Sequence, residues 1–190
     1  MNQETIVLVS GLPRSGTSMM MTMLEAGGLI PLVDHIRTAD EDNPKGYYEF
    51  ERVKQIETDQ AWLEEAKGKV VKMIAALLKH LPDRYQYKVI FIRRNMDEIL
   101  ASQKQMLIRR GEPTDTISDE KMAALFERHV EQVTAWLAEQ PNFETLYVHY
   151  TDVVQNPIQN ARQINAFLGG TLDEQAMTAA VDPNLYRQKS

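Results

Sequence analysis

The sequence predicts a three-layer α/β fold in which a central parallel sheet is flanked by helices. Short apolar runs that suit buried strands alternate along the chain with segments of helical character. The first of these runs, residues 6–9, passes through a glycine-bounded turn directly into a helix. Because ligands of such folds bind at the carboxyl ends of the strands, we expect the functional site at that edge of the sheet.

Apolar runs and boundary residues predict the individual elements. The expected strands are residues 6–9, 69–73, 88–92 and 145–149. The expected helices are residues 15–26, about 50–66, 74–80, 96–110, about 118–140, 157–168 and 173–180. Gly27 and Gly28 suit a helix end, Ser118 suits the N-cap of the long helix, and Pro157 suits a first helical position. The polar stretch at residues 29–46 predicts a loop near the strand ends.

Composition limits the classes of protein to which the chain can belong. Its 190 residues suffice for one buried core, so we expect a single domain over residues 1–190. A net charge of −6 provides no overall field for nucleic acid, and the lack of cysteine excludes disulfides and thiolate zinc sites. No apolar run is long enough to span a membrane, and the first residues lack the basic region of a secretory signal. We therefore expect a cytoplasmic protein.

The segment at residues 10–18, SGLPRSGTS, predicts a phosphate-binding loop and hence a fold of the P-loop type. In such a loop, backbone N–H groups and the positive end of a helix dipole face an anion. The spacing of Gly11 and Gly16 matches the first part of a Walker A loop, but Thr17 stands where that motif has lysine, and Ser18 follows. Arg14 could supply the missing charge. The alternative is a tight turn that binds no ligand.

A second candidate anchor for an anion follows the clearest strand. Arg94 lies just beyond residues 88–92, and Ser102 lies eight residues later on the expected helix. A guanidinium offers a fixed fork of donors that suits a phosphate dianion, and a hydroxyl adds one more donor. Lys72, at the end of another strand, is expected along the same edge of the sheet. Taken singly, Arg94 and Ser102 are better explained as a surface arginine and a helix serine.

Together these segments resemble the sulfotransferases that use 3′-phosphoadenosine-5′-phosphosulfate (PAPS) and release 3′-phosphoadenosine-5′-phosphate (PAP). The glycine-bounded loop resembles the family's phosphosulfate loop. Arg94 and Ser102 match the arginine and the serine that bind the 3′-phosphate in that family. A third match begins at residues 150–154, where Thr151 replaces the family's glutamate, and it ends at Gly169.

The resemblance implies transfer of a sulfuryl group from PAPS to a hydroxyl or amine on a small molecule, a glycan or a peptide. Arg14 and the N–H groups of residues 15–18 would hold the 5′-phosphosulfate, and Lys72 would stabilise the charge of the leaving nucleotide. The residues implied for nucleotide binding are Arg14, Ser15, Gly16, Thr17, Ser18, Arg94 and Ser102. No metal is required in this scheme.

The chain departs from the family at the general base. Cytosolic members carry Lys-Thr-His at the end of the second strand, whereas here Lys72 is followed two residues later by Ile74, which carries no titratable proton. Glu49 is the first candidate for a replacement, because it follows a polar loop and begins the expected helix. A glutamate at that position is equally explained by the helix dipole. Glu51 and Asp34 are reserve candidates.

The family's C-terminal Arg-Lys-Gly segment is absent, and Arg187 with Tyr186 could take its place. Two other functions also fit parts of the pattern. A P-loop kinase or NTPase for small molecules would need a lysine at position 17 and an aspartate for magnesium, for which Asp152 is the candidate. A non-catalytic protein that binds PAP or a partner protein would explain the missing histidine.

Overall fold

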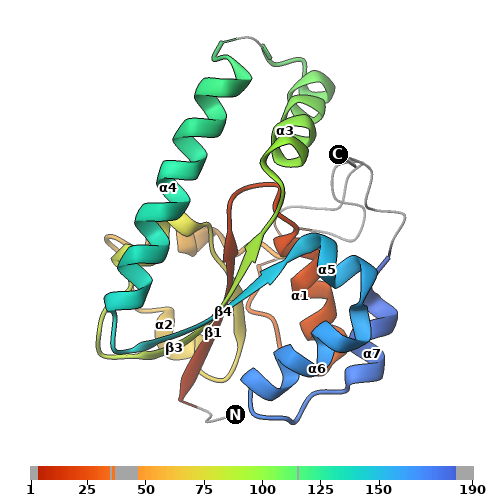
Figure 1. Ribbon diagram of the computed structural model, residues 1–190. Helices are drawn as coiled ribbons and strands as arrows, with labels where there is room; N and C mark the ends of the chain where they lie inside the picture. The colour runs from red at the N-terminus through yellow and green to blue at the C-terminus, as the bar shows by residue number, and fades with distance from the viewer. Residues whose placement is uncertain (1–3, 35, 37–46, 115, 183–190) are drawn as a thin grey trace.

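The computed structural model describes residues 4–34, 36, 47–114 and 116–182 (Figure 1). Its described part contains a sheet of four parallel strands in the order β2-β1-β3-β4. The strands are β1 (Thr5–Gly11), β2 (Val70–Lys72), β3 (Gln86–Arg93) and β4 (Phe143–His149). Because the strands are parallel, their carboxyl ends meet at one edge. The prediction of an α/β fold with a parallel sheet flanked by helices is confirmed.

The two faces of the sheet have separate hydrophobic cores, because successive residues of a strand point to opposite faces. Ile6 and Leu8 of β1 belong to one cluster, and Val7 and Val9 belong to the other. The first face is covered by α2 (Leu63–Ala66), α4 (Asp119–Glu139) and the 3₁₀ helices η1 (Glu51–Gln55) and η2 (Ala75–His80). The second is covered by α1 (Thr17–Ala26), α5 (Tyr150–Gln155), α6 (Pro157–Phe167) and α7 (Glu174–Ala180) (Figure 1).

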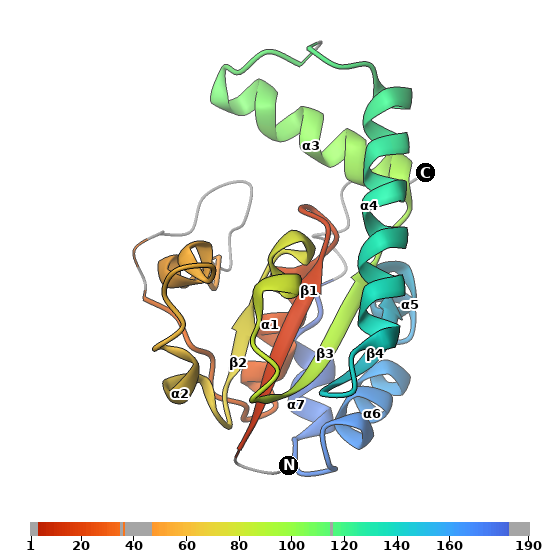
Figure 2. The same cartoon turned by 90° about the vertical axis from the view of Figure 1, so that its left-hand side faces the viewer.

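Helices α3 (Met96–Arg110) and α4 extend beyond the carboxyl edge of the sheet (Figure 2). Capping residues account for their ends. The Asn95 side chain accepts a hydrogen bond from the N–H of Asp97 at 2.8 Å, and Gly111 ends α3 with a φ of 67°. Ser118 caps α4 as predicted, and the bounds expected for both helices are confirmed.

The single helix expected over about residues 50–66 is wrong. The chain forms η1 and α2 instead, with turns between them. The carboxylate of Asp59 accepts hydrogen bonds from the N–H of Ala61 at 3.1 Å and from Arg52 at 2.7 and 2.9 Å. Bonds of this kind from an aspartate to nearby groups compete with helical hydrogen bonding, which explains the interruption.

Two smaller expectations also need correction. Residues 75–80 form a 3₁₀ helix rather than an α-helix, and a short helix for which no element was expected, α5, begins at Tyr150 directly after β4. In the loop expected at residues 29–46, Pro31 forms an isolated bridge to Val70, and Leu32 is buried beside the sheet. The acidic part of that loop, residues 40–42, lies outside the described residues.

Candidate active site

The loop between β1 and α1 depends on two glycines. Gly11 closes β1, where a Cβ atom would lie 2.6 Å from the Ile92 carbonyl oxygen and 2.7 Å from Ser15 Oγ. Gly16 has a φ of 104°, and a Cβ there would lie 2.3 Å from Cδ2 of Tyr150. Both contacts are too close for any real side chain, so the loop passes through spaces that only glycine fits.

The start of α1 offers hydrogen-bond donors to an anion. The helix begins at Thr17, with Gly16 as its N-cap; within the described residues no side chain caps it, and its first turn has no acidic residue. Ser15 is fully buried, and its Oγ has no hydrogen-bond partner among the described residues. An uncapped helix N-terminus beside an unpartnered buried hydroxyl fits a phosphate-like or sulfate-like group.

Arg14 connects this loop to the second anchor. It adopts the left-handed conformation, with a φ of 68°, which is uncommon for a residue with a side chain. Its Nε donates a hydrogen bond to Ser102 Oγ at 2.9 Å, and its carbonyl oxygen accepts one from Arg94 Nη1 at 3.1 Å. The structure thus brings Arg14, Arg94 and Ser102 together from three elements. Ser102 points back toward the strand ends, as its position on α3 predicted.

Arg94 is held on two sides. Its Nε donates to Glu98 Oε2 at 2.8 Å, and the side chains of these residues are only 8% and 2% exposed. Its guanidinium lies over the ring of Tyr150, 4.2 Å from the ring centre. Because a guanidinium has its N–H donors in one plane, this packing orients the fork.

A second group of site residues surrounds the end of β2. Lys72 Nζ donates to the carbonyl oxygen of Tyr47 and lies 3.4 Å from Ser18 Oγ in α1. The same Nζ lies 3.9 Å from Glu49 Oε1, and the Lys72 and Glu49 side chains are 14% and 23% exposed. The structure therefore places Glu49 beside Lys72 and the start of α1. Glu49 precedes η1 and does not lie within it.

The two reserve carboxylates have other contacts. Asp34 accepts hydrogen bonds from the N–H groups of Glu51 at 2.6 Å and Ile36 at 3.1 Å. The Glu51 carboxylate binds Lys54 at 2.7 Å on the surface. Ile74, at the position of the family's histidine, is 48% exposed and offers no proton acceptor. Arg187 and Tyr186 lie outside the described residues.

Three residues of this site were not assigned a role from the sequence. Glu98 follows Arg94 by four positions on α3, which is the spacing of a helical ion pair. Tyr150 lies in the third matched segment, but its contacts with Gly16 and Arg94 depend on the fold. The ring centre of Tyr47 lies 5.8 Å from Lys72 Nζ. The i, i+4 spacing of Arg94 and Glu98 was the only signal that could have been read in advance.

The described part of the chain lacks two kinds of feature, a metal-binding cluster and a membrane-spanning helix. Among the described residues, no group of three His, Cys, Asp or Glu side chains is arranged to hold a metal ion. No helix within those same residues has both the length and the apolar character needed to cross a membrane.

Solved structures of sulfotransferases share this fold. The sulfotransferase domain of the olefin synthase from Synechococcus PCC 7002 matches with a TM-score of 0.59 and 18% identity, covering 100% of this chain and 84% of that one. A sulfotransferase from Alicyclobacillus acidocaldarius matches with a TM-score of 0.56 and 16% identity, covering 95% and 87%. Mouse sulfotransferase SULT7A1, solved in complex with PAP, matches with the same TM-score and identity, covering 95% and 63%.

No curated protein matches the chain significantly. The family model described as "Sulfotransferase domain" matches residues 4–187, which include both anchors and the residues around Lys72. A kinase or NTPase is therefore excluded as the main interpretation. By this match over nearly its whole length, the chain belongs to the family of PAPS-dependent sulfotransferases.

Proposed function

We propose that this protein transfers the sulfuryl group of PAPS to a hydroxyl group of its acceptor, with Glu49 as general base and Lys72 as electrostatic catalyst. The observation that carries this proposal is the position of Glu49, whose carboxylate lies 3.9 Å from Lys72 Nζ at the start of α1. The hydrogen bond from Arg14 to Ser102 supports it, because it joins the two expected anchors of the nucleotide.

The N–H groups at the start of α1, the Ser15 hydroxyl and Arg14 are proposed to hold the 5′-phosphosulfate. This assignment rests on the uncapped helix start and on the buried Ser15 Oγ, which has no partner within the described residues. Arg94 and Ser102 are proposed to bind the 3′-phosphate. The contacts of Arg94 with Glu98 and Tyr150 orient its fork before the nucleotide arrives.

When bound, PAPS supplies the sulfuryl group and leaves as PAP. Negative charge then grows on the oxygen that joined phosphate to sulfate, and Lys72 beside Ser18 is proposed to stabilise it. The Glu49 carboxylate would accept the proton of the acceptor hydroxyl as that oxygen attacks sulfur. Lys72 Nζ also lies 3.9 Å from Glu49 Oε1. One lysine thus lies beside both the carboxylate and the proposed position of the leaving group.

Three further expectations belong to the same proposal: a single domain over residues 1–190, a cytoplasmic location, and transfer without a metal ion. The last rests on charge. Arg14, Lys72 and the α1 N–H groups supply the positive potential that a metal provides in phosphoryl transfer. The acceptor is a small molecule, a glycan or a peptide, with an amine as the alternative to a hydroxyl.

The proposal is tested by screening sulfur-labelled PAPS against pooled hydroxyl-bearing and amine-bearing small molecules, glycans and peptides. With an acceptor in hand, Glu49→Gln is expected to lower kcat by about 100-fold or more, the usual contribution of a general base. Its PAP affinity, measured by calorimetry, should not change. The matched control is Glu51→Gln, which removes a neighbouring carboxylate bound to Lys54 and should retain full activity. Full activity of Glu49→Gln would show that another group is the base.

A thermal-shift comparison separates this function from the alternatives. PAP should stabilise the protein more than ATP with magnesium. Stronger stabilisation by ATP would contradict the nucleotide assignment. PAP binding without transfer to any pool would favour a non-catalytic protein.

A further inference from the structure

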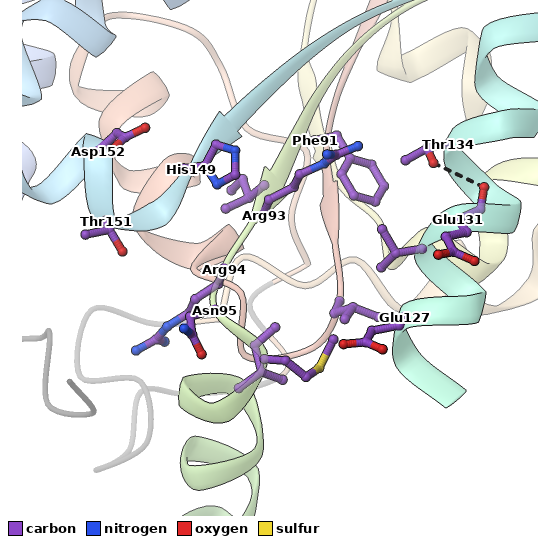
Figure 3. Close-up of a pocket in the computed structure, with 15 residues that line it drawn as sticks. Phe91, Arg93, Arg94, Asn95, Glu127, Glu131, Thr134, His149, Thr151 and Asp152 are labelled. Atoms are coloured by element: carbon purple, nitrogen blue, oxygen red, sulfur yellow. Dashed lines mark hydrogen bonds between the residues drawn. The ribbon is translucent and has the colours of Figure 1, made fainter. Parts of the chain in front are cut away.

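A pocket of about 630 Å³ lies at the carboxyl edge of β3 and β4, on the face of the sheet that α4 covers (Figure 3). Its walls come from the end of β3, the start of α3, one side of α4 and the junction of β4 with α5. Its volume falls within the range of about 300–1,000 Å³ that is usual for small-molecule sites. Arg94, which is proposed above to bind the 3′-phosphate, also lines this pocket, whereas Arg93, Glu127 and Glu131 have no role in the proposed transfer.

Alternation along two strands turns Arg93 and Tyr150 toward opposite faces of the sheet. Arg94 and Tyr150 stack on each other on the α1 face, where Tyr150 belongs to the hydrophobic core. The residues that precede them, Arg93 and His149, are paired across β3 and β4 and line the pocket on the α4 face. The guanidinium of Arg93 lies 4.6 Å from the ring centre of Tyr147, which packs against the α4-side core. Arg93 therefore stacks on a ring of the α4 face, whereas its neighbour Arg94 stacks on a ring of the α1 face and borders the same pocket.

The Arg93 side chain lines the pocket and carries an unsatisfied hydrogen-bond donor. Its Nε is buried, and no described residue accepts a hydrogen bond from it. Nor does any described carboxylate lie within ion-pair distance of its guanidinium; its recorded contact is the face of Tyr147. A buried donor without an acceptor is unfavourable, so a ligand that supplies one gains affinity. A carboxylate matches the fork of a guanidinium with two parallel hydrogen bonds.

The opposite wall of the pocket is acidic. Glu127 and Glu131 lie one turn apart on α4 and reach back toward β3, whereas Arg93 reaches from β3 toward α4 (Figure 3). Neither glutamate has a cation within ion-pair distance among the described residues. Two like charges at this helical spacing repel each other, and a cation placed between them relieves the repulsion. Between the charged walls, Ile99 and Val130 give the pocket an apolar lining.

We propose that this pocket binds a small zwitterionic molecule, with its carboxylate on Arg93, its ammonium group between Glu127 and Glu131, and an apolar chain between them. A purely anionic ligand would meet the two glutamates, and a purely cationic ligand would meet Arg93. A molecule with both charges at opposite ends satisfies both walls. The site adjoins the PAPS site at Arg94 and goes beyond the proposed transfer reaction.

The test uses linear amino acids from β-alanine to 6-aminohexanoate, added to the full-length protein with and without saturating PAP. Binding is followed by the side-chain Nε–H signal of Arg93 in ¹H–¹⁵N NMR spectra. One chain length should bind best and shift that signal, because the distance between the two walls selects the distance between the charges. Hexanoate and hexylamine, which carry one charge each, should bind at least about tenfold more weakly than the best zwitterion, since each loses a charge-assisted hydrogen bond.

Variants then test which residue binds each charged end of the zwitterion. Arg93→Gln and Glu131→Gln should each weaken the best zwitterion by about tenfold or more while PAP still stabilises the protein. Glu131 is exposed, so its variant tests the site even if Arg93→Gln fails to fold. The controls are Arg128→Gln and Glu139→Gln, which are exposed on α4 outside the pocket.

Three results would overturn the proposal: no chain length binds, hexylamine binds as well as the zwitterions, or hexanoate does. Failure of the unmodified protein to bind PAP would instead contradict the nucleotide assignment. Binding of the amino acids could still be judged in that case, because they are also tested without PAP.

Discussion

The guanidinium of Arg94 lies 4.2 Å from the ring centre of Tyr150, and the same ring closes against Gly16 in the loop before α1. Tyr150 is only 4% exposed and belongs to the core on the α1 face, so its ring is a fixed wall rather than a mobile lid. One side chain thus sets the spacing between the two proposed phosphate anchors. This arrangement explains how a loop after β1 and an arginine after β3 can be aligned before any ligand binds.

The ring of Tyr150 should therefore control the affinity for PAP. Tyr150→Leu keeps an apolar side chain but loses the ring face, and a stacked cation on such a ring is worth about 0.5–2 kcal/mol, so we expect PAP to bind roughly tenfold more weakly. Tyr150→Phe should retain most of the affinity, as measured by calorimetry. Tyr147→Leu is the matched control, because the Tyr147 ring stacks with Arg93 on the opposite face of the sheet. Equal losses in both leucine variants would contradict this role.

Glu98 should stabilise the protein and position Arg94. Its side chain is 2% exposed and accepts from Arg94 Nε at 2.8 Å. Removing one partner of a buried ion pair typically costs about 3–5 kcal/mol, so Glu98→Gln should lower the free energy of unfolding in urea by that order and weaken PAP binding. The double variant Arg94→Gln/Glu98→Gln should regain part of the stability but not the PAP binding. Asp97→Asn, an exposed neighbour on α3, is the control. A stable Glu98→Gln protein with normal affinity would argue against this role.

Local signals explain which parts of the fold could be predicted from the sequence. Helix α3 follows the Asn95 cap and ends at Gly111, and α4 begins at Ser118, so their bounds depend on neighbouring residues alone. The segment at residues 50–66 has an apolar stripe, but the Asp59 carboxylate binds Arg52 and the N–H of Ala61. An apolar pattern carries no information about that competition, which is why one helix was expected where two short ones form.

The residues of the candidate site also divide into those that the sequence indicates and those that only the fold identifies. Arg94 was expected at the ligand edge because a parallel sheet gathers strand ends, and Ser102 was paired with it through the resemblance to the family; the hydrogen bonds of Arg14 bring both to that edge. Glu49 was one of three candidate carboxylates, and only the fold separates it from Asp34 and Glu51 by placing it beside Lys72. The role of Tyr150 required knowledge of what packs on Gly16, which no local pattern provides.

Gly16 should tolerate no side chain, because a Cβ atom there would collide with Tyr150. Comparison with Gly28 separates this collision from backbone strain. Gly16 and Gly28 have similar φ values, 104° and 98°, but a Cβ on Gly16 would lie 2.3 Å from Tyr150 whereas a Cβ on Gly28 would meet no atom within 4 Å. Gly28→Ala therefore measures backbone strain alone, expected at about 1–3 kcal/mol. Gly16→Ala adds the collision with a buried ring, so it should lose more stability in urea unfolding and should lose PAP binding. If both variants were destabilised equally and bound PAP, the close packing of Gly16 on Tyr150 would not matter for PAP binding.

Lys72 should matter more for transfer than for nucleotide binding. Its Nζ lies 3.4 Å from Ser18 Oγ and 3.9 Å from Glu49 Oε1, where charge on the leaving oxygen is proposed to develop. A preorganised donor that acts on developing charge contributes about 10²–10³-fold to kcat, so Lys72→Met should lower kcat by that order while PAP still shifts the melting temperature. Lys69→Met is the control, because the ion pair of Lys69 within the described residues is with Glu65 on the surface, at 3.5 Å, and its loss should leave transfer unchanged. Equal loss of PAP binding and transfer in Lys72→Met would mean that the lysine binds the nucleotide in its ground state. Unchanged transfer would remove Lys72 from the reaction.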